Sequence, residues 1–294
     1  MANLKEVKGR IQSVVSTQQI TKAMKMVAAA KLRRAQDRIT QMRPYSQKLS
    51  EIIQNVSGSQ SEDINNPYAE EREIGKVLLV VVSSDRGLCG GFNSSAFKFA
   101  RNLIAKQYSS QEASGNLFIL PIGKKSFEFF KKRNYNVIGE YAHLMEKLDF
   151  DGAREAAEMV MAEFVKGEFD QVEIIYNEFK NVATQIVQNE QFLPIKDVTT
   201  EEVSDSNTDY IYEPSQDFIF DELLPKSLKI QFYKTLLESN ASEHGARMTA
   251  MDKATENADD LLKELRLTYN RTRQAAITTE ILEIVGGAEA LEQG

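Results

Sequence analysis

Apolar residues recur every three or four positions through the C-terminal part of the chain, from about residue 220 to residue 285. From Leu237 the steps alternate between four and three, at Leu237, Ala241, His244, Met248, Met251, Thr255, Ala258, Leu262, Leu265, Tyr269, Thr272, Ala276 and Thr279. A mean spacing of 3.5 residues is typical of a helix that winds left-handedly around another helix. The run predicts one helix of roughly 100 Å. Small residues replace Leu and Met at its end, so apolar packing alone does not hold that tip.

A second long helix is predicted over residues 1–56, where apolar residues again follow one another at steps of three and four. The step from Val14 to Ile20 changes the register. Pro44 predicts a kink or a brief break near Arg43. Two terminal helices with the same repeat are expected to pair with each other. Because the chain must return to its start, this pairing is expected to be antiparallel.

Strand and helix patterns alternate between the two long helices. The predicted strands are residues 77–82, 116–123, 136–141, 171–179 and 183–195, and the predicted helices are residues 94–106, capped by Asn93, 125–133 and 150–165. Such alternation is typical of an α/β layer with a mostly parallel sheet. The last two strands follow each other without a helix, so that edge of the sheet is expected to be antiparallel.

The predicted fold class is therefore α/β, with a long antiparallel coiled coil of the N- and C-terminal helices and an inserted Rossmann-like α/β domain. The expected organisation is an N-terminal coiled-coil helix over residues 1–56, the inserted domain over 74–196, and a C-terminal coiled-coil helix over 219–294. The two helices are expected to form one discontinuous unit.

Charge is distributed unevenly along the chain. Residues 1–50 hold eleven Lys and Arg against two acidic residues, a net charge of +9, so the chain's total of −7 leaves −16 for the rest. A basic arm on an acidic body can bind nucleic acid or anionic lipid, and it can equally fit an acidic protein surface. The single cysteine excludes an internal disulfide, and two histidines far apart argue against a Cys/His zinc site. No apolar window is long enough for a transmembrane span, and no signal peptide is evident.

The Gly-rich loop over residues 85–93 lies after a strand and before a helix, where a phosphate or dinucleotide would bind. It lacks the G-x-G-x-x-G spacing, and residues 121–126 lack the upstream glycine of a P-loop. A tight turn that lets the helix pack close to the sheet is the favoured reading. Cys89 in this loop is expected to be a small buried apolar residue rather than a reactive thiol. No catalytic constellation and no cofactor are expected.

Polar residues on the C-terminal helix are the remaining candidates. His244 lies on the apolar seam and is expected to pack in the helix core or against a partner, and Gly245 is expected to mark a place where another chain passes close. Arg273 and Gln274 lie where the seam turns small, and an Arg fork suits bidentate contact with a partner carboxylate.

Four segments together resemble the gamma subunit of F-type ATP synthases. They are QITKAMKMVAAAKLRRAQ over residues 19–36, SSDRGLCGGFN over 83–93, DYIYEP over 209–214, and the run that begins NASEHGARMTAM at Asn240. The resemblance covers essentially the whole chain. It implies a central rotor that couples transmembrane proton flow to ATP synthesis by turning inside a ring of alpha and beta subunits. Catalysis would then belong to the beta subunits.

The resemblance also implies partners: the alpha, beta and epsilon subunits and the c-subunit ring, with no nucleic acid and no small-molecule substrate. It implies a peripheral membrane protein on the cytoplasmic face of the plasma membrane. The residues that match the family's contacts with the beta subunit are Met24, Lys25, Arg247, Arg273 and Gln274. Tyr210 matches the family's foot near the c ring.

Two alternative functions remain open from the residues alone. The Gly-rich loop would serve a nucleotide-binding α/β enzyme, and the basic arm would serve a coiled-coil adaptor for nucleic acid. The sequence departs from chloroplast members of the family, because with Cys89 alone it lacks their pair of regulatory cysteines.

Overall fold

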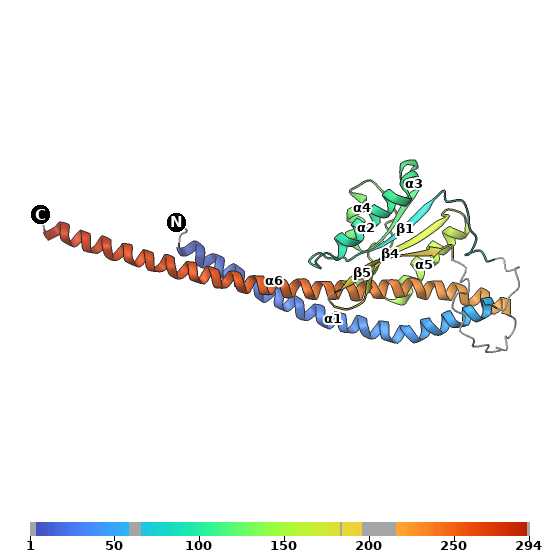
Figure 1. Cartoon of the computed structure of the whole chain (residues 1–294), viewed down its shortest axis with the longest axis horizontal. Coiled ribbons are helices and arrows are strands. Elements are labelled where there is room, and N and C mark those ends of the chain that lie inside the picture. Colours follow the sequence, from blue (N-terminus) through green and yellow to red (C-terminus); the bar gives the residue numbers. More distant parts are fainter. Residues whose placement is uncertain (1–3, 59–65, 183, 196–215, 293–294) are drawn as a thin grey trace. The chain divides into compact units, whose positions relative to one another are not determined.

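A computed structural model describes residues 4–58, 66–182, 184–195 and 216–292 (Figure 1). Two long helices, α1 (Leu4–Gly58) and α6 (Gln216–Glu292), enclose an α/β segment in sequence. The described chain divides into two compact units. The first joins residues 1–28 with 248–294, and the second comprises residues 29–247. Both long helices therefore contribute to both units. The structure is of the α/β class with the two terminal helices packed on each other, as the sequence predicts.

In the first unit, α1 and α6 form an antiparallel pair. Thr21 and Thr255 hydrogen-bond through their hydroxyls at 2.8 Å, and Lys25 Nζ lies 2.5 Å from Asp252 Oδ1. The numbers of such facing residues add up to 276 or 277. The seam of α6 is buried at Met251, Ala258, Leu262 and Leu265. A polar pair within an apolar seam disfavours slipped registers, because a slip leaves both hydroxyls without their partner.

In the second unit, five strands form one sheet in the order β3-β2-β1-β4-β5. The strands are β1 (Val77–Val82), β2 (Leu117–Ile122), β3 (Asn136–Val137), β4 (Gln171–Phe179) and β5 (Gln185–Leu193). The first four are parallel, and β5 pairs antiparallel with β4, so the predicted antiparallel edge is confirmed. All six residues of β1 are buried, as expected for a central strand covered on both faces.

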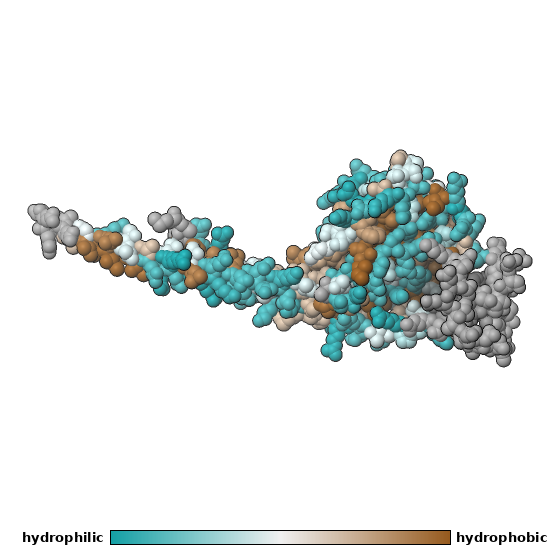
Figure 2. Space-filling view, in the orientation of Figure 1, coloured by the Kyte–Doolittle hydropathy of each residue, from teal (hydrophilic) through white to brown (hydrophobic). Residues whose placement is uncertain are grey.

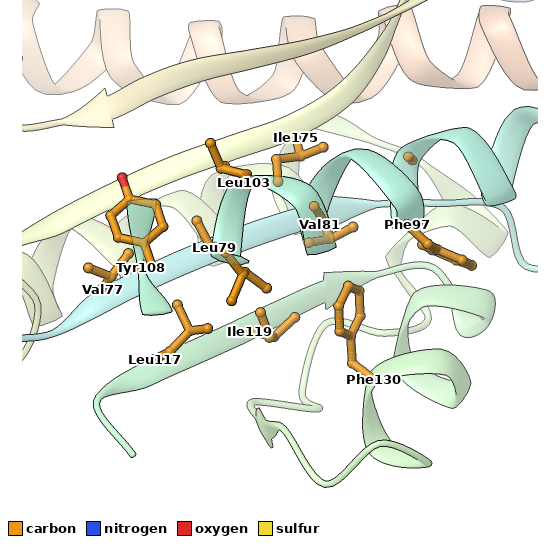
Figure 3. Packing of buried hydrophobic residues seen from close by; sticks show 13 residues of the cluster. Val77, Leu79, Val81, Phe97, Leu103, Tyr108, Leu117, Ile119, Phe130 and Ile175 are labelled. Atoms are coloured by element: carbon orange, nitrogen blue, oxygen red, sulfur yellow. The ribbon is translucent and has the colours of Figure 1, made fainter. Parts of the chain in front are cut away.

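Helices α2 (Phe92–Gln107), α3 (Ser109–Ser114), α4 (Lys124–Lys131), η1 (Leu144–Lys147) and α5 (Phe150–Val165) connect the strands. The core against α2 and α4 is built from alternate strand residues such as Leu79 and Ile119 with Phe97 and Phe130 (Figure 3). In this core Tyr108 donates its hydroxyl to the buried Glu173 carboxylate at 2.7 Å. Burial and this contact raise the pKa of Tyr108, so the phenol stays protonated and the buried carboxylate keeps a donor.

Three expectations about local structure are wrong in detail. Helix α1 runs through Pro44 as one element, so of the kink or break expected near Arg43 the break is wrong. Helix α2 starts at Phe92 after Gly91, and Asn93 does not cap it. The Asn93 amide instead accepts a hydrogen bond from Ser84 N at 3.0 Å and donates one to Ser84 Oγ at 2.7 Å. The third strand covers two residues only, Asn136–Val137, with one further backbone hydrogen bond from Ile138 N to Ile119 O at 2.9 Å.

Within the second unit, α6 is buried on nearly its whole circumference from Thr235 to Ala246. Phe232 packs against Phe192 of β5 at 5.6 Å between ring centroids, so α6 contacts the sheet as well as α1. At Gly245 a Cβ would lie 3.3 Å from a ring carbon of Phe179. The segment that passes close to this glycine is therefore the chain's own β4–β5 hairpin, instead of another chain as expected.

His244 belongs to this buried stretch and is 9% exposed. Its Nδ1 has no hydrogen-bond partner among the described residues and lies 4.0 Å from Glu243 Oε1, a carboxylate already paired with Arg247. Burial, followed by the charges of Lys31 and Arg247, lowers the pKa of His244 from its ordinary value to about 4. His244 is a neutral core residue, which confirms the helix-core prediction.

The helix register predicts a crosslink. A variant with Thr21→Cys and Thr255→Cys should form an intramolecular disulfide on mild oxidation, because these side chains face each other. A control with Thr21→Cys and Leu262→Cys should not, because position 262 lies roughly 10 Å further along α6. Mass spectrometry of linked peptides distinguishes them, and equal crosslinking of both pairs would rule out the register.

The lowered pKa of His244 predicts a pH dependence of stability. The unfolded state binds a proton below about pH 6.5, whereas the folded state does so only near pH 4. Stability should therefore fall as the pH drops from 6.5 toward 4, with a slope of up to about 1.4 kcal/mol per pH unit from this group. Urea unfolding of the wild type and of His244→Gln should give slopes that differ by this amount. Parallel pH profiles would contradict the burial argument.

Candidate partner-binding surface

Among the residues of the first unit that the structure describes, no helix lies beside the C-terminal end of α6. Because facing residue numbers add up to 276 or 277, Leu4, the first described residue of α1, lies opposite Thr272 or Arg273. The remaining residues of α6, 273–292, extend roughly 30 Å further. Figure 1 shows α6 continuing past the N-terminal end of α1. We call residues 273–288, the part of this extension with described side chains, the tip.

The tip is exposed along its whole length, although it carries many apolar side chains. Those with substantial exposure are Ile277, Ile281, Leu282, Ile284 and Val285, and Figure 2 shows them as a hydrophobic surface toward the C-terminus. The hydroxyls of Thr278 and Thr279 donate to carbonyls of their own helix, at Gln274 and Ala275. The tip can therefore bind a partner mainly through apolar contacts, because few of its side chains are free to make directional bonds.

Arg273 and Gln274 lie at the start of the tip, where the two-helix pairing ends. Both are exposed, and neither side chain has a hydrogen bond or ion pair with another residue that the structure describes. A guanidinium has five N–H donors and a side-chain amide has two, with one carbonyl acceptor. With the exposed carboxylates of Glu280 and Glu283, these are groups at this end of α6 that can make directional bonds.

Met24 and Lys25 lie in the paired part of the first unit. Met24 is half-buried, and the Lys25 ammonium pairs with Asp252 across the helices, where both side chains are substantially exposed, at 40% and 59%. An exposed pair of this kind contributes little stability, so Lys25 can exchange its partner at small cost. Exposed apolar residues flank it on α1 at Ile20, Met26 and Val27.

Arg247 is placed differently from the other candidate residues. Its side chain is only 11% exposed, and Nη2 lies 2.6 Å from Glu243 Oε1, one helical turn away. The same guanidinium donates to the carbonyl oxygens of Arg86, at 3.1 Å, and Gly87. Arg247 thus fastens the Gly-rich loop to α6.

The loop held by Arg247 has a strained conformation. Leu88 has a φ of 64°, in the left-handed region that costs a side chain such as leucine roughly 1–2 kcal/mol, and it is 67% exposed. Its neighbour Cys89 is 2% exposed and packs with Phe92 and Ala246. The prediction that Cys89 is a buried apolar residue is confirmed. An exposed leucine held in a strained turn is an observation that points to function.

The crevice at the carboxyl ends of β1 and β2 is filled by the chain itself. The Asp85 carboxylate accepts a hydrogen bond from Lys124 N at 3.0 Å, at the N-terminus of α4, and Ser83 Oγ accepts one from Ser126 N at 2.8 Å. Burial raises the pKa of Asp85, an effect that the Lys124 hydrogen bond partly offsets. A Cβ at Gly123 would lie 2.2 Å from Ser83 O, so this glycine permits the close approach. The anion position at this helix terminus is taken by Asp85.

Tyr210 lies outside the described residues. In the part of the chain that the structure describes, no three His, Cys, Asp or Glu residues group in a way that could hold a metal ion. Within the same part, no helix combines the length and apolar character needed to cross a membrane.

Three features of this surface were not predicted. Asp252 could be identified as the partner of Lys25 only once the helix register was known. A heptad pattern shows which face of each helix is apolar, but it does not determine how far one helix is shifted along the other. Glu243 as the partner of Arg247 has an i, i+4 spacing that the sequence does show, and this spacing is a known signal for helix ion pairs. The strained backbone of Leu88 could not be predicted from the sequence, because leucine is not a residue typical of left-handed turns.

Sequence comparison connects this geometry to one family. The model of a family described as ATP synthase matches residues 3–291. The ATP synthase gamma chain of Cytophaga hutchinsonii is 60% identical over 293 residues, covering 99% of both chains. Those of Chloroherpeton thalassium and Flavobacterium psychrophilum are 50% and 52% identical over 302 and 292 residues, covering 99% or more of each chain.

Solved structures agree with this grouping. The central stalk and c ring of Tetrahymena thermophila mitochondrial ATP synthase contain a chain with a TM-score of 0.55 and 25% identity, which covers 80% of this chain and 99% of its own length. A chain in the Euglena gracilis mitochondrial ATP synthase shares the fold, with a TM-score of 0.66 at 18% identity over 99% and 95% of the two chains. These matches show that the chain belongs to the ATP synthase gamma chain family, the central rotor stalk of F-type ATP synthase.

Proposed function

We propose that this chain is a non-catalytic subunit whose rotation inside a ring of alpha and beta subunits biases the nucleotide affinity of each beta subunit. The observation that carries the proposal is the length of α6 beyond the start of α1. An isolated helix with exposed apolar residues is a place where another protein is expected to bind. A ring of subunits around the tip would cover those residues on all sides.

The composition of the tip suits rotation within such a ring. Apolar contacts are non-directional, so Ile281 or Val285 loses little when the surface that it faces changes. Arg273 and Gln274 differ, because hydrogen bonds to a carboxylate depend on direction. A contact that forms with only one beta subunit at a time gives each subunit a different free energy at each rotor angle, which is a coupling free energy.

We propose that Met24 and Lys25 form a second contact with the beta subunit. The Lys25 ammonium is half-exposed, and the Asp252 pair that it would give up is weak. An acidic segment of the beta subunit would compete with Asp252 for this cation. The flanking Ile20, Met26 and Val27 would supply apolar area around it.

For Arg247 we propose a positioning role in the contact with the beta subunit. Its guanidinium is occupied by Glu243 and by the loop carbonyls, so the partner would meet the loop that Arg247 holds. Leu88 would be the apolar group offered there.

The remaining partners follow from the family and form part of the same proposal. They are the epsilon subunit and the c ring, with Tyr210 in the segment nearest the ring, and a location on the cytoplasmic face of the membrane. Proton flow would drive the rotation during ATP synthesis, and ATP hydrolysis in the beta subunits would drive it in reverse. The helices of residues 1–56 and 219–294 would act as the shaft, and the α/β domain of residues 74–196 as part of its base.

The tip contacts predict a coupling defect. The double variant Arg273→Ala/Gln274→Ala should lower proton-driven ATP synthesis by about fivefold, the rate equivalent of roughly 1 kcal/mol. Synthesis in inverted membrane vesicles measures the effect, and subunit stoichiometry checks assembly. Arg266→Ala, an exposed change in the paired part of α6, is the control and should behave as wild type. Normal synthesis by the double variant under load would refute these contacts.

The attachment of the Gly-rich loop to α6 by Arg247 predicts a change in the reactivity of Cys89, the chain's only cysteine. Arg247→Met should release the loop, leave Glu243 buried without its partner, and cost about 2–4 kcal/mol. Labelling by a thiol reagent should then become at least about tenfold faster, because the loop opens more often. Arg266→Met on the exposed face of the same helix should label at the wild-type rate. If Arg247→Met labels no faster, the loop does not depend on this residue.

A further inference from the structure

A polar cleft of about 270 Å³ lies on the α/β domain, and the residues that line it are different from those discussed above as partner contacts. Its walls come from α2, from the turn between α3 and β2, and from the turn between α4 and β3. Arg101 and Arg133 lie on its walls, and the buried Leu117 forms part of its lining. Nothing in a rotor shaft requires such a cleft.

One of the two cations is held in place by aromatic contacts. The Arg133 guanidinium lies over the ring of Phe129 at 3.7 Å and donates Nη1 to Phe129 O at 3.0 Å. Phe129 is itself stacked on Phe97 of the core at 4.4 Å. Four of the five guanidinium N–H groups remain for a ligand. An immobilised guanidinium loses less conformational entropy on binding than a free one.

The second cation, Arg101, is available for a ligand. Arg101 is exposed on α2 and has no hydrogen bond or ion pair with another residue that the structure describes. The one carboxylate of the cleft, Glu112, lies close enough to the Tyr135 hydroxyl to affect its pKa. Burial, followed by the Glu112 carboxylate, raises the pKa of Tyr135, and the positive charge of Arg101 opposes the rise, so Arg101 also lies near the phenol.

The surrounding surface favours anions. Residues 97–137 hold eight Lys and Arg against two Glu, a net charge of +6 in a chain whose total is −7. Hydrophilic side chains cover much of the surface over α2 and α4 (Figure 2). A concentrated positive field of this kind raises the local concentration of anions.

We propose that this cleft binds a phosphate ester between Arg101 and Arg133. Guanidinium groups bind phosphate through two parallel hydrogen bonds, and two of them can hold one phosphate group. Asn136 donates its amide to Gly115 O at 2.8 Å, which leaves its side-chain oxygen as an acceptor for a hydroxyl of the ester's alcohol. The ligand class is therefore a polyol phosphate, whose source is either a soluble metabolite or the headgroup of an anionic lipid.

Two probes applied to the full chain test the proposal and separate the two sources. Calorimetry with glycerol 3-phosphate, at fixed ionic strength, measures binding of the soluble ester. Cosedimentation with phosphatidylcholine vesicles, with and without phosphatidylglycerol, measures binding of the headgroup. Arg101→Gln and Arg133→Lys are the test variants, and the second keeps the charge while losing the fork. Lys98→Gln removes an exposed cation from the same helix outside the cleft and is the matched control.

Saturable binding of either probe that weakens by about tenfold in Arg101→Gln and Arg133→Lys, and not in Lys98→Gln, is the expected result. Binding of the soluble ester identifies a metabolite, and binding of the vesicles alone identifies the lipid headgroup. Two results overturn the proposal. One is the absence of binding of both probes at millimolar concentration, and the other is an equal loss in Lys98→Gln, which shows diffuse attraction to a basic surface.

Discussion

The antiparallel packing of α1 on α6 is the interaction on which the rest of this chain depends. Helix α6 has 77 residues and α1 has 55, so the two cannot match end to end. The register fixed around Thr21 and Thr255 decides where the excess goes. It leaves the C-terminal end of α6 without a partner, and that end is the part of the chain most suited to enter another assembly. A register shifted by one heptad would bury or expose a different set of residues at the tip.

Helix α6 packs differently in its two halves. In the second unit α6 lies against both α1 and the sheet, so even Ser239 and Glu243 are buried. In the first unit only one seam is buried, and past Thr272 none is. This gradient from buried to exposed along one helix separates an anchoring segment from a segment that other proteins can surround.

The polar side chains of this structure fall into two groups, those bonded to other residues of the chain and those that are not. Arg247, Asp85 and Glu173 are satisfied by their own chain, and each stabilises a local arrangement: a loop on a helix, a helix terminus, or a core contact. Lys25 is held loosely, and Arg273, Gln274 and Arg101 are not held at all by described residues. The uncommitted groups are the better candidates for binding, because no internal bond must break first.

The sequence alone determined the architecture, because the heptad period of the terminal helices and the strand–helix alternation between them each allow one simple solution. It also pointed to Arg273 and Gln274, since the seam visibly thins around them. The tertiary structure decided what periodicity leaves open. Helix register emerged from the Thr21–Thr255 and Lys25–Asp252 pairs, which join residues more than 220 positions apart. The roles of Arg247 and of the strained Leu88 depended on a loop and a helix meeting in space. The presence of Arg101 and Arg133 at one cleft depended on helix α2 and the turn after α4 lying close together. Local pattern fixes which face of an element is apolar, but only packing fixes which residues of distant elements face each other.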